Sequence, residues 1–370
     1  MLAVIAAPLL AVWLGSCSKA DIPQVPAASS DALPLDARLP EAIPPNTRLV
    51  IGDPTTQRVL ELTGWNRQLH FNVEWAQITG GPAVTEAFHA KALDVGFVAD
   101  VPPIHATWVG IPVKIIAVEL HRDFINHPLY VIGVAPHAAV TTLADLRGKR
   151  IAFSPGQVQG EVVLRTLREE GLSSRDVTLV ELPSSGDAYL NALAGGSVDV
   201  APIAAGALTK RYLDQYAAAG AKVLRHGPFR DDLTLLYVRE ETLRDRAKAA
   251  ALREYVQLWA RAAAWTETHE DEWARVYWVQ NQGLSSEEAR SQIEAYGPRD
   301  IPSDWSQAIA IEQSVIELLA PSTSQSRFDA TTLFDRRFES VASGAFMAAG
   351  GRVAADDSVP ARGLQLANSR

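Results

Sequence analysis

The arrangement of apolar residues constrains the fold of this chain more than any other feature of its sequence. Short apolar runs alternate with amphipathic segments over the first two-thirds of the chain. The runs predict strands at 48–51, 69–75, 95–98, 113–118, 130–134, 150–153, 177–182, 198–203, 222–224 and 234–238, with helices between most of them, the first at 54–62. This alternation predicts an α/β fold in which helices flank mixed, largely parallel sheets.

Beyond Val238 the pattern changes to long amphipathic helices, which we expect at 243–268, 273–280, 286–296 and 305–319. Five tryptophans fall in this helical part, and we expect most of them to pack between helices rather than to form a binding site. They are Trp259, Trp265, Trp273, Trp278 and Trp305.

Length, charge and histidine spacing narrow the range of functions. The region from 47 to 343 is long enough for two lobes, because a single core usually stops growing near about 250 residues. The net charge of −9 argues against a nucleic-acid partner, whose phosphates would require a basic face. The eight histidines are scattered without metal-ligand spacing, so the sequence predicts no metal site.

The N-terminus carries an apolar run from Leu2 to Leu14 that ends in two small residues before Cys17. The run is shorter than the about 20 residues needed to span a bilayer, which favours a signal peptide over a transmembrane helix. Residues 14–17, Leu-Gly-Ser-Cys, resemble the bacterial lipoprotein signal, in which the cysteine is lipidated after cleavage. Two alternatives stay open: a buried N-terminal helix and, because neither Lys nor Arg precedes Lys19, an upstream start.

The segments next to the expected lobes have the composition of unstructured chain. Prolines recur among alanine, serine and aspartate at 18–46, which predicts a tether that holds the folded part off a membrane. Residues 344–370 are rich in glycine, alanine, serine and aspartate, and we expect a disordered tail there.

Small turns with helix-capping residues follow several of the predicted strands. Aspartate suits the capping position and proline the first helical position, and both occur in these turns. Helix starts beyond the carboxyl ends of strands attract anions through their N–H groups and the helix dipole. The sequence therefore predicts a site for a small oxyanion at the turns 52–56, 79–82, 99–103 and 154–159.

Several motifs resemble the aliphatic sulfonate-binding proteins of ABC transporters, a family of type II periplasmic binding proteins that also includes nitrate and taurine binders. The likeness spans 47–340 and rests on Asn-Val-Glu-Trp at 72–75 with Gly-Pro at 81–82, Leu-Asp-Val-Gly-Phe at 93–97, Asp-Val-Pro-Pro-Ile at 100–104, and the stretches 142–153, 164–171 and 192–200. The resemblance implies two α/β lobes, joined by crossover strands near 118–130 and 229–238, that close on a ligand. It places lobe 1 at 47–122 plus 235–343 and lobe 2 at 123–234.

The family's ligand site, carried over position by position, falls on the turns described above. His121 and Arg230, near the expected hinge, are further candidates because each can complement an anion. Alternatives remain for both, since a hinge arginine often pairs with a neighbouring acid and a histidine often packs. The implied ligand contacts are Thr55, Thr56, Gln57, Gly81, Asp100, His121, Gln157, Val158, Gln159 and Arg230.

One stretch departs from the family pattern. Sulfonate-binding relatives carry aromatic-Asp-Pro-aromatic residues after the strand at 198–203, whereas this chain reads Ala-Ala-Gly-Ala at 204–207. We expect those aromatic residues to form a wall of the ligand site in the relatives. Their absence here would leave room for a bulkier organic tail on the ligand.

The resemblance implies an exported substrate-binding lipoprotein, monomeric and held by lipid at the extracytoplasmic face of a membrane. It would capture a small organic anion, foremost an aliphatic or aryl sulfonate, and deliver it to an ABC transporter permease. Nitrate, taurine or a thiamine-precursor heterocycle remain alternative ligands, and a sensing domain that partners a membrane kinase remains an alternative role.

Enzymes of the same fold are the competing class, and those of the family depend on cysteine chemistry. The single cysteine, Cys17, lies outside the expected lobes, so this chain offers no cysteine nucleophile there. It also contains neither a Gly-x-Ser-x-Gly elbow nor a phosphate-binding Gly-Lys-Thr/Ser loop. We therefore expect no catalytic residues and no cofactor.

Overall fold

The computed structural model describes residues 32–78, 80–184 and 187–353, and all elements below belong to the compact unit that begins at Leu33. The predicted signal peptide, Cys17, the first part of the tether and the last part of the tail lie outside the described residues.

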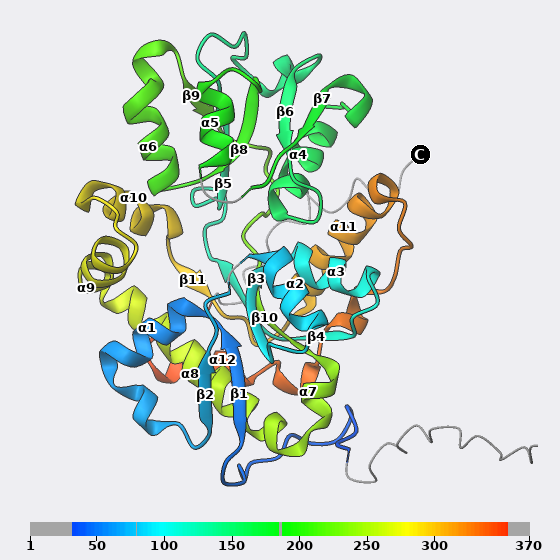
Figure 1. Cartoon of the computed structure of the whole chain (residues 1–370), viewed down its shortest axis with the longest axis vertical. Coiled ribbons are helices and arrows are strands. Elements are labelled where there is room, and N and C mark those ends of the chain that lie inside the picture. The colour runs from blue at the N-terminus through cyan, green and yellow to red at the C-terminus, as the bar shows by residue number, and fades with distance from the viewer. Residues whose placement is uncertain (1–31, 79, 185–186, 354–370) are drawn as a thin grey trace, which may run out of the picture. The chain divides into compact units, whose positions relative to one another are not determined.

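Two mixed sheets organise the fold (Figure 1). The first has the order β11-β4-β10-β3-β1-β2, and the second has the order β7-β6-β8-β5-β9. The first is built from β1 (Arg48–Gly52), β2 (Asn72–Trp75), β3 (Val95–Ala99), β4 (Val113–His121), β10 (Thr234–Arg239) and β11 (Arg299–Asp300). The second is built from β5 (Tyr130–Val134), β6 (Arg150–Phe153), β7 (Thr178–Glu181), β8 (Val200–Ala204) and β9 (Lys222–Leu224).

Helices flank both sheets, which confirms the α/β fold expected from the alternating pattern. After the strands come α1 (Pro54–Thr63), α2 (Gly81–His89), α3 (Val101–Trp108), α4 (Val158–Glu169), α5 (Ala188–Ala194) and α6 (Ala207–Tyr216). The helical C-terminal part contains α7 (Glu240–Arg244), α8 (Arg246–Thr268), α9 (Glu270–Trp273), the π-helix η5 (Ala274–Asn281), α10 (Ser286–Tyr296), α11 (Ser306–Thr323) and α12 (Val341–Ala348). Short 3-10 turns lie at η1 (Trp65–Gln68), η2 (Leu143–Leu146), η3 (Ser174–Asp176), η4 (Ala217–Ala219), η6 (Ala330–Leu333) and η7 (Arg336–Phe338).

Strand directions are less uniformly parallel than the alternation suggested. β1 pairs in parallel with β2 and β3, and β6 pairs in parallel with β7 and β8. β10 is antiparallel to β3 and β4, and β5 is antiparallel to β8 and β9. The chain leaves the first sheet through 122–129 and returns to it through 225–233, close to the expected crossovers. β5 and β10, the strands that follow these two connections, pair antiparallel to their neighbours.

Tryptophan burial follows the expectation from the sequence. Trp259, Trp273 and Trp305 are only 3%, 2% and 1% exposed, which confirms that they pack in the core. Trp265 and Trp278 remain half-buried. Both also pack against the cluster around Trp273 and Tyr277, with part of each residue left exposed.

The packed region is longer at both ends than the predicted lobes. Leu33 and Leu39 are buried, and the Leu33 N–H donates to the Arg244 carbonyl at 2.8 Å, so part of the expected tether is packed chain. At the other end, α12 extends past residue 344 because Phe346 is fully buried. Burying such a side chain stabilises by about 1.5–3 kcal/mol, enough to hold a short alanine-rich helix in place. The average composition of a segment does not reveal single buried apolar residues such as Leu33, Leu39 and Phe346.

Candidate functional site

Sheet topology gathers several helix starts at one edge of the first sheet. β1 lies between β2 and β3 and runs parallel to both, so the carboxyl ends of the three strands share an edge. α1, α2 and α3 follow these strands in turn. In the second sheet the parallel strands β6 and β8 are followed by α4 and α6. Ligands of open α/β sheets bind beyond such strand ends.

The start of α1 is held by a buried carboxyl. Asp53 is 1% exposed, and its Oδ1 accepts from the Thr56 N–H at 3.0 Å while its Oδ2 accepts from the Tyr255 hydroxyl at 2.9 Å. Burial raises the pKa of Asp53, and the hydrogen bonds oppose that rise. The Thr55 hydroxyl lies 3.4 Å from the hydroxyl of Tyr277. The predicted contact Gln57 bonds to other side chains, Glu61 at 2.8 Å and Gln77 at 3.2 Å.

The starts of α2 and α4 come from different sheets and meet. A Cβ built on Gly81 would lie 2.5 Å from Pro102 Cγ and 3.8 Å from Gln157 Oε1, and one built on Gly156 would lie 3.3 Å from His105 Cδ2. Neither Gly80 nor Gln157, the two N-cap residues, gives its helix a side-chain hydrogen bond. The Gln157 side chain thus lies beside the α2 start, and the free N–H groups of neither helix start have a side-chain cap from their N-cap residue.

The structure thus brings together Gly81, Asp100 and the 157–159 turn, as the sequence grouped them. Val158 is buried, and Gln159 is half-buried with its Oε1 lacking a hydrogen-bond partner among the described residues. The Asp100 Oδ1 accepts from the Val101 N–H at 2.8 Å, and its Oδ2 likewise has no partner in the described part of the chain. Whether these residues contact a ligand remains a prediction.

Two buried carboxyls that sequence reasoning missed lie near Asp100. They are Glu161 on α4 and Glu312 on α11, both 0% exposed. Burial and then the charge of Glu161 raise the pKa of Asp100 well above its ordinary range. Burial, followed by Asp100 and Glu161, raises the pKa of Glu312 in the same way. We name Asp100, Glu161 and Glu312 the acid cluster.

One guanidinium partly compensates the acid cluster. Arg165 Nε donates to Glu161 Oε1 at 2.7 Å, and Arg165 Nη2 donates to Ser314 Oγ at 3.2 Å, so the arginine connects α4 with α11. Its positive charge lowers the pKa of Glu161, but burial dominates and the net direction is upward. With three carboxyls near one arginine, protonation of a carboxyl would reduce the buried unpaired charge in this region.

His121 and Arg230, the residues expected near the hinge, are joined by hydrogen bonds. Arg230 Nη1 donates to Asp232 Oδ2 at 2.7 Å, and Arg230 Nη2 donates to the His121 carbonyl at 3.1 Å. His121 is 2% exposed, and its Nδ1 lies 2.8 Å from the His127 carbonyl. Both side chains therefore have protein partners, which is the alternative that the sequence left open, and their contact with a ligand stays a prediction.

At the Ala-Ala-Gly-Ala stretch, 204–207, α10 occupies part of the space that we inferred from the sequence. A Cβ built on Gly206, where φ is +83°, would lie 2.9 Å from Gln292 Cα, and the Ala207 N–H donates to Gln292 Oε1 at 3.1 Å. The small residues allow α10 to pack there. A helix far along the chain thus fills the space beside Gly206 and Ala207, and room for a bulkier ligand tail at this stretch stays a prediction.

Aromatic side chains near the α1 start were also missed as site candidates. Tyr277 and Trp278 lie on η5, and Tyr296 ends α10. Trp278 is one of the five tryptophans of which most were expected to pack; it packs against a core cluster, but it is only half-buried and its Nε1 has no hydrogen-bond partner among the described residues. The only sequence signal was the adjacent pair Tyr277 and Trp278, and such a pair is equally typical of a helix that packs in the core.

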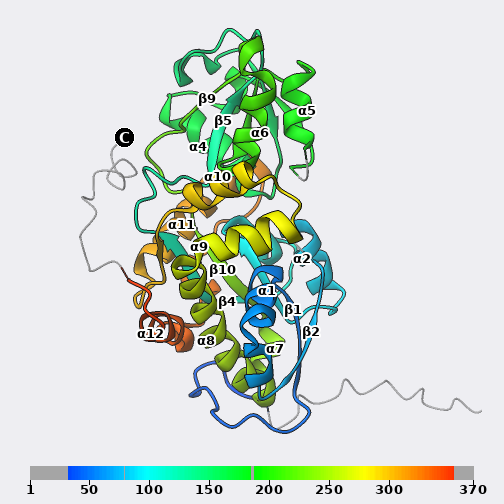
Figure 2. The ribbon, with the colours of Figure 1, turned by 90° about the vertical axis from the view of Figure 1, so that its left-hand side faces the viewer.

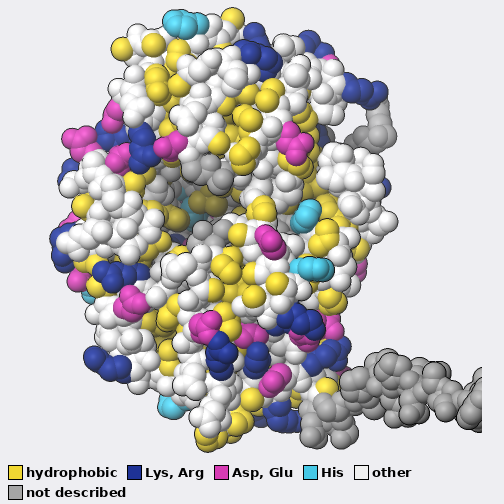
Figure 3. Space-filling view, viewed as in Figure 1, with side chains coloured by type: hydrophobic (Ala, Val, Ile, Leu, Met, Phe, Trp, Pro, Cys, Tyr) yellow, Lys and Arg dark blue, Asp and Glu magenta, His cyan; other side chains and the backbone are white. Residues whose placement is uncertain are grey.

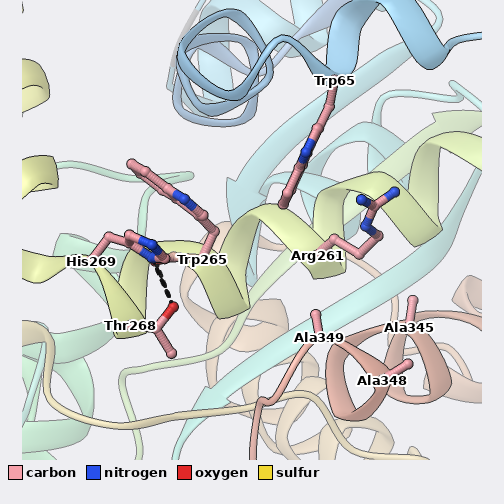
Figure 4. Close-up of a pocket in the computed structure, with 8 residues that line it drawn as sticks. All are labelled: Trp65, Arg261, Trp265, Thr268, His269, Ala345, Ala348 and Ala349. Atoms are coloured by element: carbon pink, nitrogen blue, oxygen red, sulfur yellow. Dashed lines mark hydrogen bonds between the residues drawn. The ribbon is translucent and has the colours of Figure 1, made fainter.

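A groove of about 350 Å³ lies elsewhere, on α8, η1 and α12 (Figure 4). Its aromatic walls already have partners: the Arg261 guanidinium lies 4.3 Å from the Trp65 ring, and Trp265 stacks on His269 at 4.6 Å. The groove contains none of the helix starts described above. Figure 3 shows instead that the face seen in Figure 1 is hollowed near mid-height, between the parts that carry the two sheets.

Within residues 32–78, 80–184 and 187–353, no cluster of His, Cys, Asp or Glu side chains is arranged to hold a metal ion. In the same part of the chain, no helix combines the length and apolarity needed to cross a bilayer.

Comparison with known proteins agrees with this architecture. A putative aliphatic sulfonates-binding protein of Escherichia coli (strain K12) is 32% identical over 105 residues, which is 28% of this chain and about a third (32%) of that relative's length. The crystal structure of the periplasmic aliphatic sulphonate binding protein SsuA from Escherichia coli matches with a TM-score of 0.65 at 22% identity, covering 79% of this chain and 92% of that one.

The fold is shared with an enzyme as well. The desulfurization enzyme DSZB matches with a TM-score of 0.56 at 14% identity, covering 81% of this chain and 99% of that one. Likeness at such identities shows the fold alone. A family model described as NMT1/THI5 like matches residues 63–272, which is more than half of the chain. This match shows that the chain belongs to the NMT1/THI5 like family.

Proposed function

We propose that this protein is the substrate-binding component of an ABC importer. It captures a small organic anion, foremost a sulfonate, between its two lobes and delivers it to a membrane permease. The observation that carries the proposal is the meeting of the α2 and α4 starts, two helix N-termini from different sheets without side-chain caps. Because an anion can bond to N–H groups on both sides, it stabilises the closed arrangement through its greater affinity for that state.

The acid cluster is compatible with an anionic ligand if Asp100 is protonated. The pKa of Asp100 is raised well above its ordinary range, chiefly by burial. A neutral carboxyl does not repel an anion, and its hydroxyl can donate a hydrogen bond, for which Asp100 Oδ2 is free of partners in the described chain. Sulfonate affinity should therefore fall as the pH rises through the folded-state pKa of Asp100. Asp100→Asn should remove that pH dependence, which calorimetric titrations between pH 5 and about 8 would measure.

A panel of ligands tests the function directly. Ethanesulfonate, taurine, sulfate, nitrate and a thiamine-precursor pyrimidine would each be added while the melting temperature is recorded. A ligand at 100 times its Kd stabilises by about 2.7 kcal/mol, so a true ligand gives a clear upward shift. A panel without any shift would refute the proposed function, and a shift by the pyrimidine alone would redirect it to a thiamine precursor.

Matched glycine variants locate the site. Gly81→Ala places a Cβ against Pro102 and the 157 turn, and it should abolish the ligand-induced shift. Gly344→Ala adds its Cβ on α12, where no atom lies within 4 Å, and should keep the shift. Equal ligand responses from the two variants would place the site elsewhere.

We also propose that lipid on Cys17 anchors the exported protein. Cys17→Ser should release the full chain from the membrane fraction into the soluble extracytoplasmic fraction. Unchanged membrane association of that variant would contradict the anchor. A lipid-tethered binding protein would stay close to its permease, and the absence of another cysteine argues against cysteine-dependent catalysis.

A further inference from the structure

Tyr277, Trp278 and Tyr296 form a continuous row of aromatic rings, which we name the aromatic row. The Tyr277 and Trp278 rings meet edge to face with centroids 4.8 Å apart, and the Trp278 and Tyr296 centroids are 6.2 Å apart. Tyr277 also stacks on the buried Trp273 at 4.2 Å with an interplanar angle of 5°. The row is therefore backed by core side chains, although Trp278 and Tyr296 are only half-buried.

The two ends of the aromatic row touch parts of the candidate site. At one end, the Tyr277 hydroxyl lies 3.4 Å from the Thr55 hydroxyl at the start of α1. At the other end, the Tyr296 ring lies 6.3 Å from the ring of the hinge residue His121. The row thus runs from an anion-attracting helix start to the crossover between the sheets.

α10 holds the row against the part of the chain that carries the second sheet. Arg211 Nε on α6 donates to Glu288 Oε1 on α10 at 2.7 Å, and Gln292 accepts from the Ala207 N–H. Figure 2 shows α10 lying directly below α6 on this side of the molecule. η5 packs on α10, so the row borders elements of both sheets. Side chains held by such packing need little reordering to bind a ligand.

One atom of the row indicates a ligand. Trp278 Nε1 is buried and has no hydrogen-bond partner in the described part of the chain. A buried indole N–H normally finds an acceptor, and leaving it without one is costly. An acceptor atom on a bound molecule would satisfy it.

We propose that Trp278 and Tyr296 form the specificity wall of the ligand site and select an organic anion with a planar aromatic group. The inference rests on the proposed function. In this chain, η5 and α10 would supply the aromatic wall that the residues at 204–207 do not provide. The anionic head lies at the helix starts, and the ring packs edge to face or offset against Trp278 and Tyr296. The unpartnered Trp278 Nε1 would donate to an acceptor on the ligand.

The test compares naphthalene-2-sulfonate with ethanesulfonate by isothermal titration calorimetry on the full chain. The wild type should bind the aryl sulfonate more tightly than ethanesulfonate. Trp278→Leu should weaken the aryl ligand about tenfold, the size of one good aromatic contact, while ethanesulfonate changes less than about twofold. Retained ethanesulfonate binding also shows that the variant is folded. Trp278→Phe should keep most of the aryl preference, which separates the ring from the N–H.

Trp265→Leu is the matched control, because Trp265 is a half-buried tryptophan of the same helical part that lies outside the aromatic row. It should leave both affinities unchanged. Wild-type binding of ethanesulfonate as tight as that of the aryl ligand, or equal losses for both ligands in Trp278→Leu, would overturn the wall while leaving the proposed function standing. Binding of neither sulfonate would overturn the proposed function, and this inference with it.

Discussion

Glu312 offers the sharpest test of how the buried acid cluster is organised. It is 0% exposed on α11, and neither of its carboxyl oxygens has a hydrogen-bond partner in the described chain. Burial is the main cause of its raised pKa, and the charges of Asp100 and Glu161 add to it. The replacement Glu312→Gln keeps the shape and polarity of the side chain but removes its ability to ionise.

The sign of the effect follows from the direction of that pKa. A carboxyl whose folded-state pKa is raised stabilises fully below its ordinary value of 4.5, and this stability is lost as pH rises through the folded-state pKa. The Glu312→Gln variant cannot ionise at this position, so its free energy of unfolding does not fall with pH for this reason. Relative to wild type, the variant should gain up to about 1.4 kcal/mol per pH unit above pH 5 until the folded-state group ionises. Near pH 4 the two proteins should differ by less than about 0.5 kcal/mol.

Urea unfolding followed by circular dichroism at pH 4, 5, 6 and 7 would measure these free energies. Glu317→Gln is the matched control, because Glu317 lies on the same helix but its side chain is 48% exposed and pairs with Arg327. It should change stability by less than about 1 kcal/mol at every pH. The reasoning is refuted if Glu312→Gln is less stable than wild type at pH 7, or if its advantage does not grow with pH.

Two further substitutions test the packing around the site, each by urea unfolding. Gly206→Ala should destabilise by more than about 1 kcal/mol, because φ is +83° and the new Cβ would lie 2.9 Å from Gln292 Cα. Gly110→Ala, with φ +81° and no atom within 4 Å, carries the backbone strain alone, so equal costs would contradict the packing of α10 on 204–207. Tyr255→Phe should cost about 1–3 kcal/mol, because it leaves the Oδ2 of buried Asp53 without a donor; a loss under about 0.5 kcal/mol would show that this bond does not hold the α1 start.

Much of the fold could be predicted because strands and helix starts depend on residues that are close in sequence. The expected strand at 150–153 and the expected helix at 286–296 match β6 and α10, and Asp53 caps α1 from the turn where capping was expected. Antiparallel pairing of β5 and β10 was harder to foresee. A strand's direction depends on its partners, which the alternation of apolar residues does not reveal.

Part of the candidate site could likewise be predicted from the sequence, and part could not. The grouping of Gly81, Asp100 and Gln157 followed from turn chemistry and the family resemblance. The aromatic row did not, because an aromatic side chain on an amphipathic helix looks like a core residue until its neighbours are known.

The sequence by itself determined the α/β architecture, the positions of the helix starts and the limits set by a single cysteine. These features follow from local periodicity, turn chemistry and composition. Only the tertiary structure placed the Tyr277 hydroxyl beside Thr55, 222 positions away, packed α10 into the space at 204–207, and buried Glu312 near Asp100. Such contacts depend on how distant helices pack on the sheets, and the pattern along a single segment carries no record of them.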